Sequence, residues 1–156
     1  MHIVSAGPQH VPDIIEIWKE LMDFHEKIDP GLGRGEKGHI HYQKHIERMM
    51  DSERAQVLVA VDQGEVLGYS LAILLEIPPI LTYSKRGFIS EIAVRSAYRR
   101  KGIGTEMVAR ILEWFDSQDI NQIQVQVSCK NEIGYNFWKA QGFKENLYVM
   151  RKLKPE

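Results

Sequence analysis

The stretch from Glu91 to Thr105 has the residue types and spacing of an anion-binding turn. A short β-branched run ends at Val94, the basic residues Arg99, Arg100 and Lys101 follow, and two closely spaced glycines come next. Apolar residues then recur every three or four positions, which predicts an amphipathic helix. The first N–H groups of a helix are free, and the helix dipole adds roughly half a positive charge there. The turn therefore predicts a phosphate or pyrophosphate site, with an ordinary solvated basic turn as the alternative.

Two well-known phosphate motifs do not fit this turn. A nucleotide P-loop needs Gly-Lys-Ser/Thr, whereas Gly104 is followed directly by Thr105. The dinucleotide-binding fingerprint needs a small residue where Met107 stands. It also needs an acidic residue at the end of the next strand, which here ends in Ser128. A different family of phosphate-binding folds must therefore be considered.

The turn resembles that of the GNAT superfamily of acetyl-CoA-dependent N-acyltransferases, in which Arg-x-x-Gly-x-Gly follows a strand and holds the coenzyme A pyrophosphate. Here the motif is Arg99-x-x-Gly102-x-Gly104. A second stretch, Asn131-x-x-Gly134-x-x-Phe137-Trp138-x-x-x-Gly142-Phe143, is similar to the family's Asn-x-x-Ala-x-x-Leu-Tyr-x-x-x-Gly-Phe. The two signatures occur in the family's order, and with their surrounding elements they cover nearly the whole chain.

The resemblance implies an N-acetyltransferase that moves the acetyl group of acetyl-CoA to a primary amine of a small molecule or peptide, by direct attack in a ternary complex. A protein or peptide N-acetyltransferase and a non-catalytic acyl-CoA sensor remain alternatives. Strand residues would hold the pantetheine through backbone groups, with the Val94 N–H as a candidate oxyanion donor. The implied coenzyme-binding residues are Ile92, Ala93, Val94, Arg99, Arg100, Lys101, Gly102, Ile103, Gly104, Thr105, Asn131 and Trp138.

Glu91 is the candidate general base. It is the only carboxylate in the central apolar run and is flanked by Ile89 and Ile92. Burial among such neighbours raises the pKa of a carboxyl group, which suits a group that must take a proton from an ammonium. A solvated or ion-paired Glu91 is the alternative interpretation, and Glu76 is a weaker rival for the same role.

The candidate general acid departs from the family pattern. Trp138 stands where the family has a tyrosine that faces the coenzyme sulfur, and an indole N–H is no useful acid near neutral pH. Tyr135 lies about one helical turn earlier and is the candidate proton donor, with water as the alternative. Trp138 then lines the pantetheine tunnel or packs in the core. Asn131 caps a helix, contacts the coenzyme, or does both.

Composition favours one domain spanning residues 1–156. The net charge of −1 gives no electrostatic case for nucleic acid or an anionic membrane. The resemblance implies acetyl-CoA and an amine acceptor as the partners. A homodimer is left open. The single Cys129 allows no internal disulfide, and no signal pattern or membrane span is found, so we expect a cytoplasmic protein. His41 and His45 are one turn apart but lack the zinc-hydrolase Glu, so no metal is expected.

Hydrophobic periodicity predicts a single α/β domain with a mixed sheet, and the resemblance implies the GNAT fold. We therefore expect a mixed, mostly antiparallel central sheet of six to seven strands flanked by about four helices, and the resemblance implies a splay between its fourth and fifth strands. The expected strands are 2–4, 56–61, 65–77, 88–94, 122–128 and one or two within 143–153. The expected helices cover 11–25, 39–50, the segment after Gly102, and 131–142.

Overall fold

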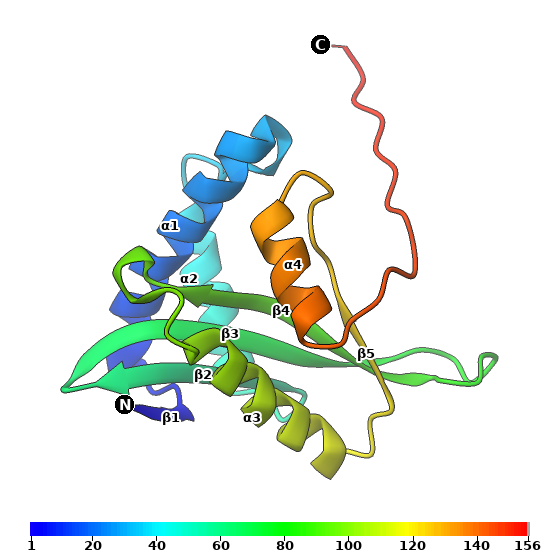
Figure 1. The fold of residues 1–156 in the computed structure, drawn as a ribbon, viewed down its shortest axis with the longest axis horizontal. Helices are drawn as coiled ribbons and strands as arrows, with labels where there is room; N and C mark the ends of the chain where they lie inside the picture. Colours follow the sequence, from blue (N-terminus) through cyan, green and yellow to red (C-terminus); the bar gives the residue numbers. More distant parts are fainter. Residues whose placement is uncertain (156) are drawn as a thin grey trace.

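One five-stranded sheet forms the centre of the computed structural model, which describes residues 1–155 (Figure 1). The strands are β1 (His2–Ser5), β2 (Ala55–Asp62), β3 (Glu65–Glu76), β4 (Lys85–Val94) and β5 (Gln122–Val125). The helices are α1 (Val11–Ile28), α2 (Gly38–Met50), α3 (Ile103–Ser117) and α4 (Glu132–Ala140). Short 3-10 turns lie at η1 (Pro8–His10), η2 (Pro30–Leu32) and η3 (Ser96–Tyr98). The mixed α/β architecture with four helices agrees with the prediction.

The strands lie in sequence order across the sheet, with antiparallel pairing from β1 to β4 and parallel pairing between β4 and β5. A two-residue turn at Gln63 and Gly64 joins β2 to β3, and both residues have positive φ angles. The twist of this turn matches the twist of an antiparallel pair, so β2 and β3 form a hairpin. The parallel β4–β5 connection needs a crossover, which α3 supplies.

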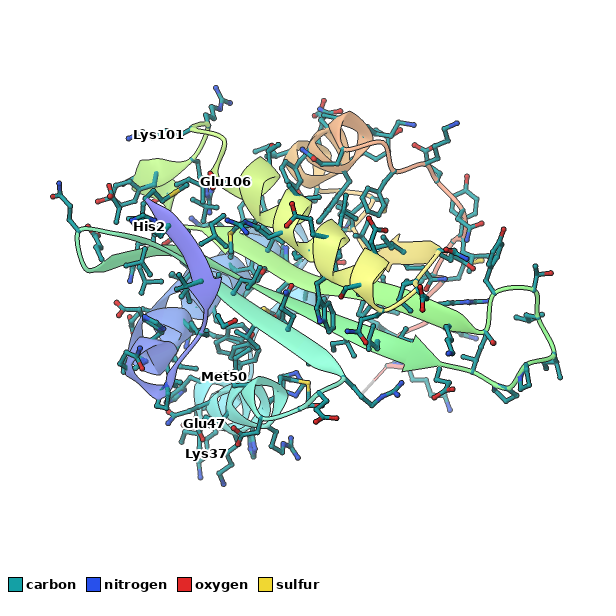
Figure 2. All side chains as sticks on the ribbon, turned by 90° about the horizontal axis from the view of Figure 1, so that it is seen from below. His2, Lys37, Glu47, Met50, Lys101 and Glu106 are labelled. Atoms are coloured by element: carbon teal, nitrogen blue, oxygen red, sulfur yellow. The ribbon has the colours of Figure 1, made fainter. Side chains whose placement is uncertain are left out.

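Two hydrophobic cores lie on opposite faces of the sheet (Figure 2). Residues of α1 and α2, including Ile14 and Ile46, pack with Tyr69 and Leu71 of β3 on one face. On the other face, α3 residues such as Phe115 pack against the sheet. The aromatic residues Trp138 and Phe143, at and after the end of α4, join this second core as partly buried residues. The central strands therefore contribute side chains to both cores.

A β-bulge halfway along β4 changes which face of the sheet its later side chains point to. Leu71 of β3 pairs with Glu91, but the next β3 residue pairs with Ile89, so Ser90 has no β3 partner. In a regular strand, residues two apart share a face. Because of the extra residue, Ile89 lies in the α3 core, whereas Ala93 lies in the α1/α2 core. The bulge therefore turns Glu91 toward the α1/α2 face, which simple alternation from Ile89 does not predict.

The prediction of six to seven strands was wrong. The residues described hold five strands, and the segment 143–153, expected to supply the last one or two, has no strand. Polar contacts hold it elsewhere: Glu145 accepts hydrogen bonds from Tyr135 and Lys139, and Arg151 pairs with Asp29. Between these anchors the side chains of residues 147–150 are 80–95% exposed. The local apolar pattern therefore does not determine the conformation of this segment.

Candidate active site

The carboxylate of Glu91 lies at the meeting point of α2, β3 and β4. The Tyr42 hydroxyl of α2 donates to Glu91 Oε2 at 2.5 Å, and the Tyr69 hydroxyl of β3 lies 3.5 Å from the same oxygen. The two hydroxyl oxygens are 3.2 Å apart. Tyr69 is fully buried and Tyr42 nearly so. The predicted base is therefore a partly buried carboxylate held by two tyrosines, and it makes no salt bridge within residues 1–155.

Burial raises the pKa of Glu91 to about 7, while the hydrogen bonds from Tyr42 and Tyr69 oppose part of that rise. Desolvation disfavours the charged carboxylate, whereas hydrogen-bond donors favour it. The same burial, with the nearby carboxylate, raises the pKa of both tyrosines, so their hydroxyls stay protonated. A carboxyl group that titrates near neutral pH has the proton affinity that a general base needs there.

Sequence reasoning missed the two tyrosines. Helical spacing puts Tyr42 on the same face of α2 as Ile46, but nothing in the sequence links it to Glu91, which is 49 residues away. The indole of Trp18 stacks on the Tyr42 ring at 4.6 Å with an angle of 7° between the planes. A Cβ at Gly38 would lie 3.2 Å from that indole, so this glycine helps α2 approach α1. The one available signal for Tyr69 is a phenol within an apolar strand, where a buried hydroxyl needs a partner.

The backbone of β4 loses its β5 neighbour just before Glu91. Parallel pairing ends at Ile89 and Val125, and no later residue of β4 pairs with β5. The edge of the predicted pantetheine-binding residues Ile92, Ala93 and Val94 is therefore free on that side. An unpaired strand edge offers N–H and C=O groups to a ligand that carries amides. The splay between the fourth and fifth strands and the predicted base thus occur at the same point of one strand.

The predicted anion-binding turn has a backbone that favours glycine and a helix end without a side-chain cap. Gly102 has a φ of +82° and precedes α3, and Arg100 also has a positive φ, at +62°. No side chain caps the first turn of α3 within the described part of the chain. A Cβ at Gly102 would meet no atom within 4 Å. The free N–H groups and open space give this turn what an anion requires.

The three basic residues of the turn differ in their contacts. Arg99 bends back: its Nε donates to the Val94 carbonyl at 3.0 Å, and its guanidinium lies 3.7 Å from Glu20 of α1. Both Arg100 and Lys101 are exposed, and Lys101 lies at the edge of the molecule (Figure 2), with its ammonium 5.3 Å from the centre of the Tyr98 ring. Arg99 therefore braces the strand end, while Arg100 and Lys101 provide the charge that is free to meet a ligand.

Helix α4 packs against the start of α3. A Cβ at Gly104 would lie 3.3 Å from the Phe137 ring, and Thr105 Oγ1 accepts a hydrogen bond from Gln141 at 3.0 Å. The preceding Ile103 is buried in the α3 core. Gly104 thus serves the approach of two helices, a role that the sequence interpretation, which stressed phosphate access, did not include. Substituting it would disturb this packing as well as any ligand.

Asn131 and Trp138, both expected near the coenzyme, have clear structural roles. The Asn131 Oδ1 accepts a hydrogen bond from the Gly134 N–H at 2.9 Å and so caps α4. A Cβ at Gly134 would lie 2.5 Å from the Asn131 amide nitrogen, which explains glycine where the family pattern has alanine. Trp138 packs edge-on against Phe137 and Phe143, with ring centroids 4.9 and 5.1 Å apart. Coenzyme contacts of Asn131 and Trp138 remain predictions.

Tyr135, the candidate acid, lies on an exposed part of α4. Its hydroxyl donates to Glu145 Oε1 at 2.5 Å, and this bond is the largest cause of its raised pKa. Lys139 lies 3.1 Å from the same Glu145 oxygen. The hydroxyl is therefore occupied by a carboxylate, and it must leave Glu145 before it can give its proton to a departing sulfur.

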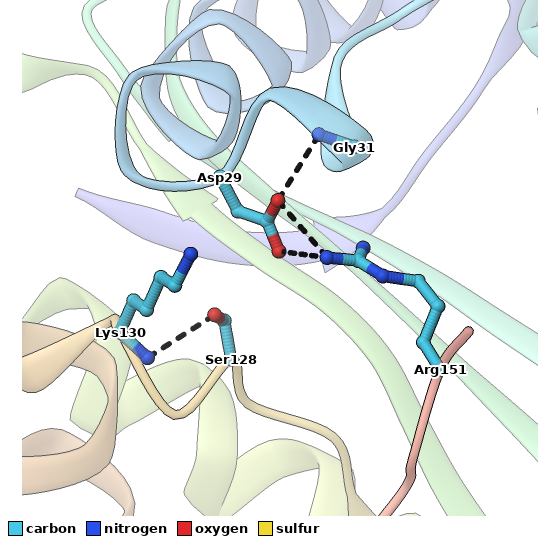
Figure 3. A network of polar contacts seen from close by, with 5 residues as sticks. All are labelled: Asp29, Gly31, Ser128, Lys130 and Arg151. Carbon is cyan, nitrogen blue, oxygen red and sulfur yellow. Dashed lines mark hydrogen bonds and ion pairs between the residues drawn. The ribbon is translucent and has the colours of Figure 1, made fainter. Parts of the chain in front are cut away.

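A polar network joins the loop after α1 to the C-terminal segment (Figure 3). Asp29 Oδ1 accepts a hydrogen bond from the Gly31 N–H at 3.0 Å, and one Arg151 nitrogen, Nη2, donates to both carboxylate oxygens, at 3.2 Å to Oδ1 and 2.9 Å to Oδ2. The Gly31 bond, followed by Arg151, lowers the pKa of Asp29. Lys130, in the β5–α4 connection, points toward the same carboxylate (Figure 3). The network ties together three segments that are distant in sequence.

Two searches of the described residues gave negative results. Residues 1–155 contain no group of three or more His, Cys, Asp or Glu side chains arranged to hold a metal ion. In the same part of the chain, no helix combines the length and apolar character that crossing a membrane requires.

Comparison with known proteins gives a family match and close structural neighbours. The family model of the acetyltransferase (GNAT) family matches residues 15–143. An N-alpha-acetyltransferase of Sulfurisphaera tokodaii is 30% identical over 109 residues, which are 67% of this chain and 65% of that protein. This chain thus spans just under two thirds of that relative's length.

Two solved structures show the shared fold. The tetramutant of the BH1408 protein from Bacillus halodurans has a TM-score of 0.89 and 22% identity, over 99% of this chain and 100% of that one. A predicted acetyltransferase from Clostridium acetobutylicum, solved with acetyl-CoA, has a TM-score of 0.79 and 16% identity. The match covers 97% of this chain and 95% of the Clostridium acetobutylicum chain.

The raised pKa of Glu91 makes a prediction about stability that does not depend on activity. Its native pKa of about 7 exceeds the ordinary value of 4.5, so the folded protein binds this proton more tightly than the unfolded chain. The wild type is therefore most stable below the ordinary carboxyl pKa and loses stability as the pH rises through the native pKa. Glu91→Gln, which resembles the protonated carboxyl group, should match the wild type near pH 4 and exceed its unfolding free energy by about 3 kcal/mol near pH 8.

Urea unfolding at the two pH values measures this difference, with exposed Glu113→Gln on α3 as the control that should show no pH-dependent gain. A difference between Glu91→Gln and the wild type that stays constant with pH would contradict the buried, protonatable carboxyl group.

Proposed function

The chain belongs to the GNAT family of acetyltransferases, and we propose that it transfers the acetyl group of acetyl-CoA to a primary amine with Glu91 as the general base. The observation that carries this proposal is the position of Glu91: a carboxyl group that titrates near neutral pH lies where β4 separates from β5. A base and an unpaired strand edge at one point provide the two functions that such a reaction requires.

The coenzyme is assigned to two backbone features. The free edge of Ile92, Ala93 and Val94 would hold the amides of the pantetheine arm, and the uncapped start of α3 with Gly102 would hold the pyrophosphate. Acetyl-CoA supplies the activated acyl group when bound. Arg100 and Lys101 contribute attraction for the phosphates, while Arg99 keeps the end of β4 in place.

Glu91 would take a proton from the acceptor ammonium, because an ammonium nitrogen has no free electron pair with which to attack. The N–H bond breaks, its electron pair stays on nitrogen, and the proton goes to a carboxylate oxygen. The departing sulfur has an ordinary thiol pKa of about 8.5, so it needs no strong acid. The Tyr135 hydroxyl is held by Glu145, so we propose that water gives the departing sulfur its proton, with Tyr135 as the alternative donor.

The acceptor class follows from matching proton affinities. A peptide α-amine has a pKa of about 7.7–8.0, whereas a lysine side chain has about 10.4. Transfer to a carboxylate with a pKa of about 7 is therefore much less unfavourable from an α-ammonium than from a lysine. The name of the Sulfurisphaera tokodaii relative, an N-alpha-acetyltransferase, supports the same choice. We propose an α-amino group as the preferred acceptor.

Turnover measurements on matched acceptors test the proposed function. The wild type should acetylate a short peptide with a free α-amine at least about tenfold more efficiently, in kcat/KM near pH 7.5, than the same peptide with a blocked α-amine and a free lysine. Glu91→Gln should lower kcat by about 10²-fold or more and leave coenzyme affinity largely unchanged. Coenzyme binding without turnover on any amine would instead indicate an acyl-CoA sensor.

The coenzyme site makes a separate prediction about charge. Replacing both exposed basic residues in Arg100→Glu/Lys101→Glu should weaken coenzyme A binding by about tenfold or more, because two positive charges beside the phosphates become negative. Isothermal titration calorimetry measures the affinity, and Lys44→Glu/Arg48→Glu, at two exposed positions of α2, is the control with the same change of net charge. Equal affinity in the Arg100→Glu/Lys101→Glu variant and the control would place the pyrophosphate elsewhere. Gly104 is a poorer choice because it also packs on Phe137.

A further inference from the structure

The two oxygens of the Glu91 carboxylate have different surroundings. Both tyrosine hydroxyls lie at Oε2, at 2.5 Å for Tyr42 and 3.5 Å for Tyr69. Oε1 has no hydrogen-bond partner within residues 1–155, and it is not one of the fully enclosed polar atoms that lack partners. Oε1 is therefore not fully enclosed, while Oε2 is held on the protein side.

We propose that Tyr42 and Tyr69 are positioning residues that hold Oε2 of Glu91, so that Oε1 is the atom that receives the acceptor's proton. This proposal rests on the function proposed above, in which Glu91 is the base. A carboxylate can rotate and exchange its oxygens unless one of them is fixed, and proton transfer requires a base within hydrogen-bond reach of the proton.

The two tyrosines differ in how strongly their hydroxyls can bond Glu91. Each phenol has one proton to donate. Tyr42 gives its proton to Glu91 at 2.5 Å, which leaves the Tyr69 proton for the Tyr42 oxygen at 3.2 Å or for Glu91 at 3.5 Å. Hydrogen bonds weaken steeply at such lengths, so Tyr42 makes the principal contact and Tyr69 supports it.

The surroundings of Tyr42 fix its direction. Trp18 of α1 stacks on its ring, and His45 from the next turn of α2 lies 5.9 Å from the ring centroid. From β3 the titratable neighbour is Tyr69, and β4 contributes Glu91 itself. No charged side chain other than Glu91 contributes to the shifts of the two tyrosines, and none to that of Glu91. Removing the Tyr42 hydroxyl therefore removes its contacts with Glu91 and Tyr69 and leaves the local charges in place.

This arrangement also makes the hold on the proposed base depend on helix α2. Tyr42 belongs to α2, which follows the loop that begins at Asp29 and is tied to Arg151. A displacement of α2 would move the hydroxyl away from Oε2 without breaking any bond in the sheet. The orientation of the base thus depends on the position of α2 as well as on β4.

The experiment compares Tyr42→Phe, Tyr69→Phe and the control Tyr148→Phe, whose side chain is 95% exposed. Phenylalanine keeps the ring and its stacking on Trp18, and thermal unfolding checks that each variant folds. The Glu91 carboxyl is titrated directly by ¹³C NMR in the absence of any substrate, with Glu91→Gln used to assign the signal. Rate–pH profiles are then recorded with a peptide acceptor.

Tyr42→Phe should raise the titration midpoint of Glu91 by about one pH unit, Tyr69→Phe by less, and the control not at all. The low-pH limb of kcat should move by the same amount, and the plateau of kcat should fall about tenfold while KM for acetyl-CoA stays constant. An unchanged midpoint in Tyr42→Phe overturns the proposal, as does an unchanged plateau. Full activity of Glu91→Gln, together with a shifted Glu91 midpoint in Tyr42→Phe, would show that Glu91 is not the base. The hydrogen bond from Tyr42 would then still position the carboxylate.

Discussion

The proposed active site depends on the short hydrogen bond from Tyr42 to Glu91. A carboxylate that leaves water loses favourable solvation, and without a donor it would simply stay protonated. Tyr42 reaches it only because α2 packs on α1 through the stacked rings of Trp18 and Tyr42. The helical layer on this face therefore has a chemical consequence: it decides how much of the carboxyl group is ionised near neutral pH.

The second constraint is the irregularity at Ser90. One extra residue in β4 places Ile89 in the core under α3 and turns Glu91 toward the opposite layer. The pairing with β5 stops at Ile89 as well. A single local change in one strand thus does two things, since it redirects a carboxylate and it releases the backbone that we assign to the pantetheine arm. Bulges often occur next to active sites for this reason.

Much of this arrangement could be predicted from the sequence, and the remainder has physical reasons for being hidden. The turn at Gly102, the cap at Asn131 and the acidic residue at position 91 depend on local residue types, so they could be found from one chain. Tyr69 could not be linked to Glu91, because their contact joins neighbouring strands whose register no local pattern reports. The last strands were wrongly predicted because the apolar residues 147–150 have strand character, yet Glu145 and Arg151 are held by other partners.

The central claim is that the acyl donor lies along the free edge of β4, within reach of Oε1 of Glu91. A crystal structure of the protein with coenzyme A and an acetylated peptide product tests it most directly. We expect the pantetheine amides to bond the backbone of Ile92 to Val94 and the product nitrogen to lie within a direct hydrogen bond, or one bridging water, of Oε1. A pantetheine arm bound away from β4, or a product nitrogen with neither contact to Glu91, would contradict the account.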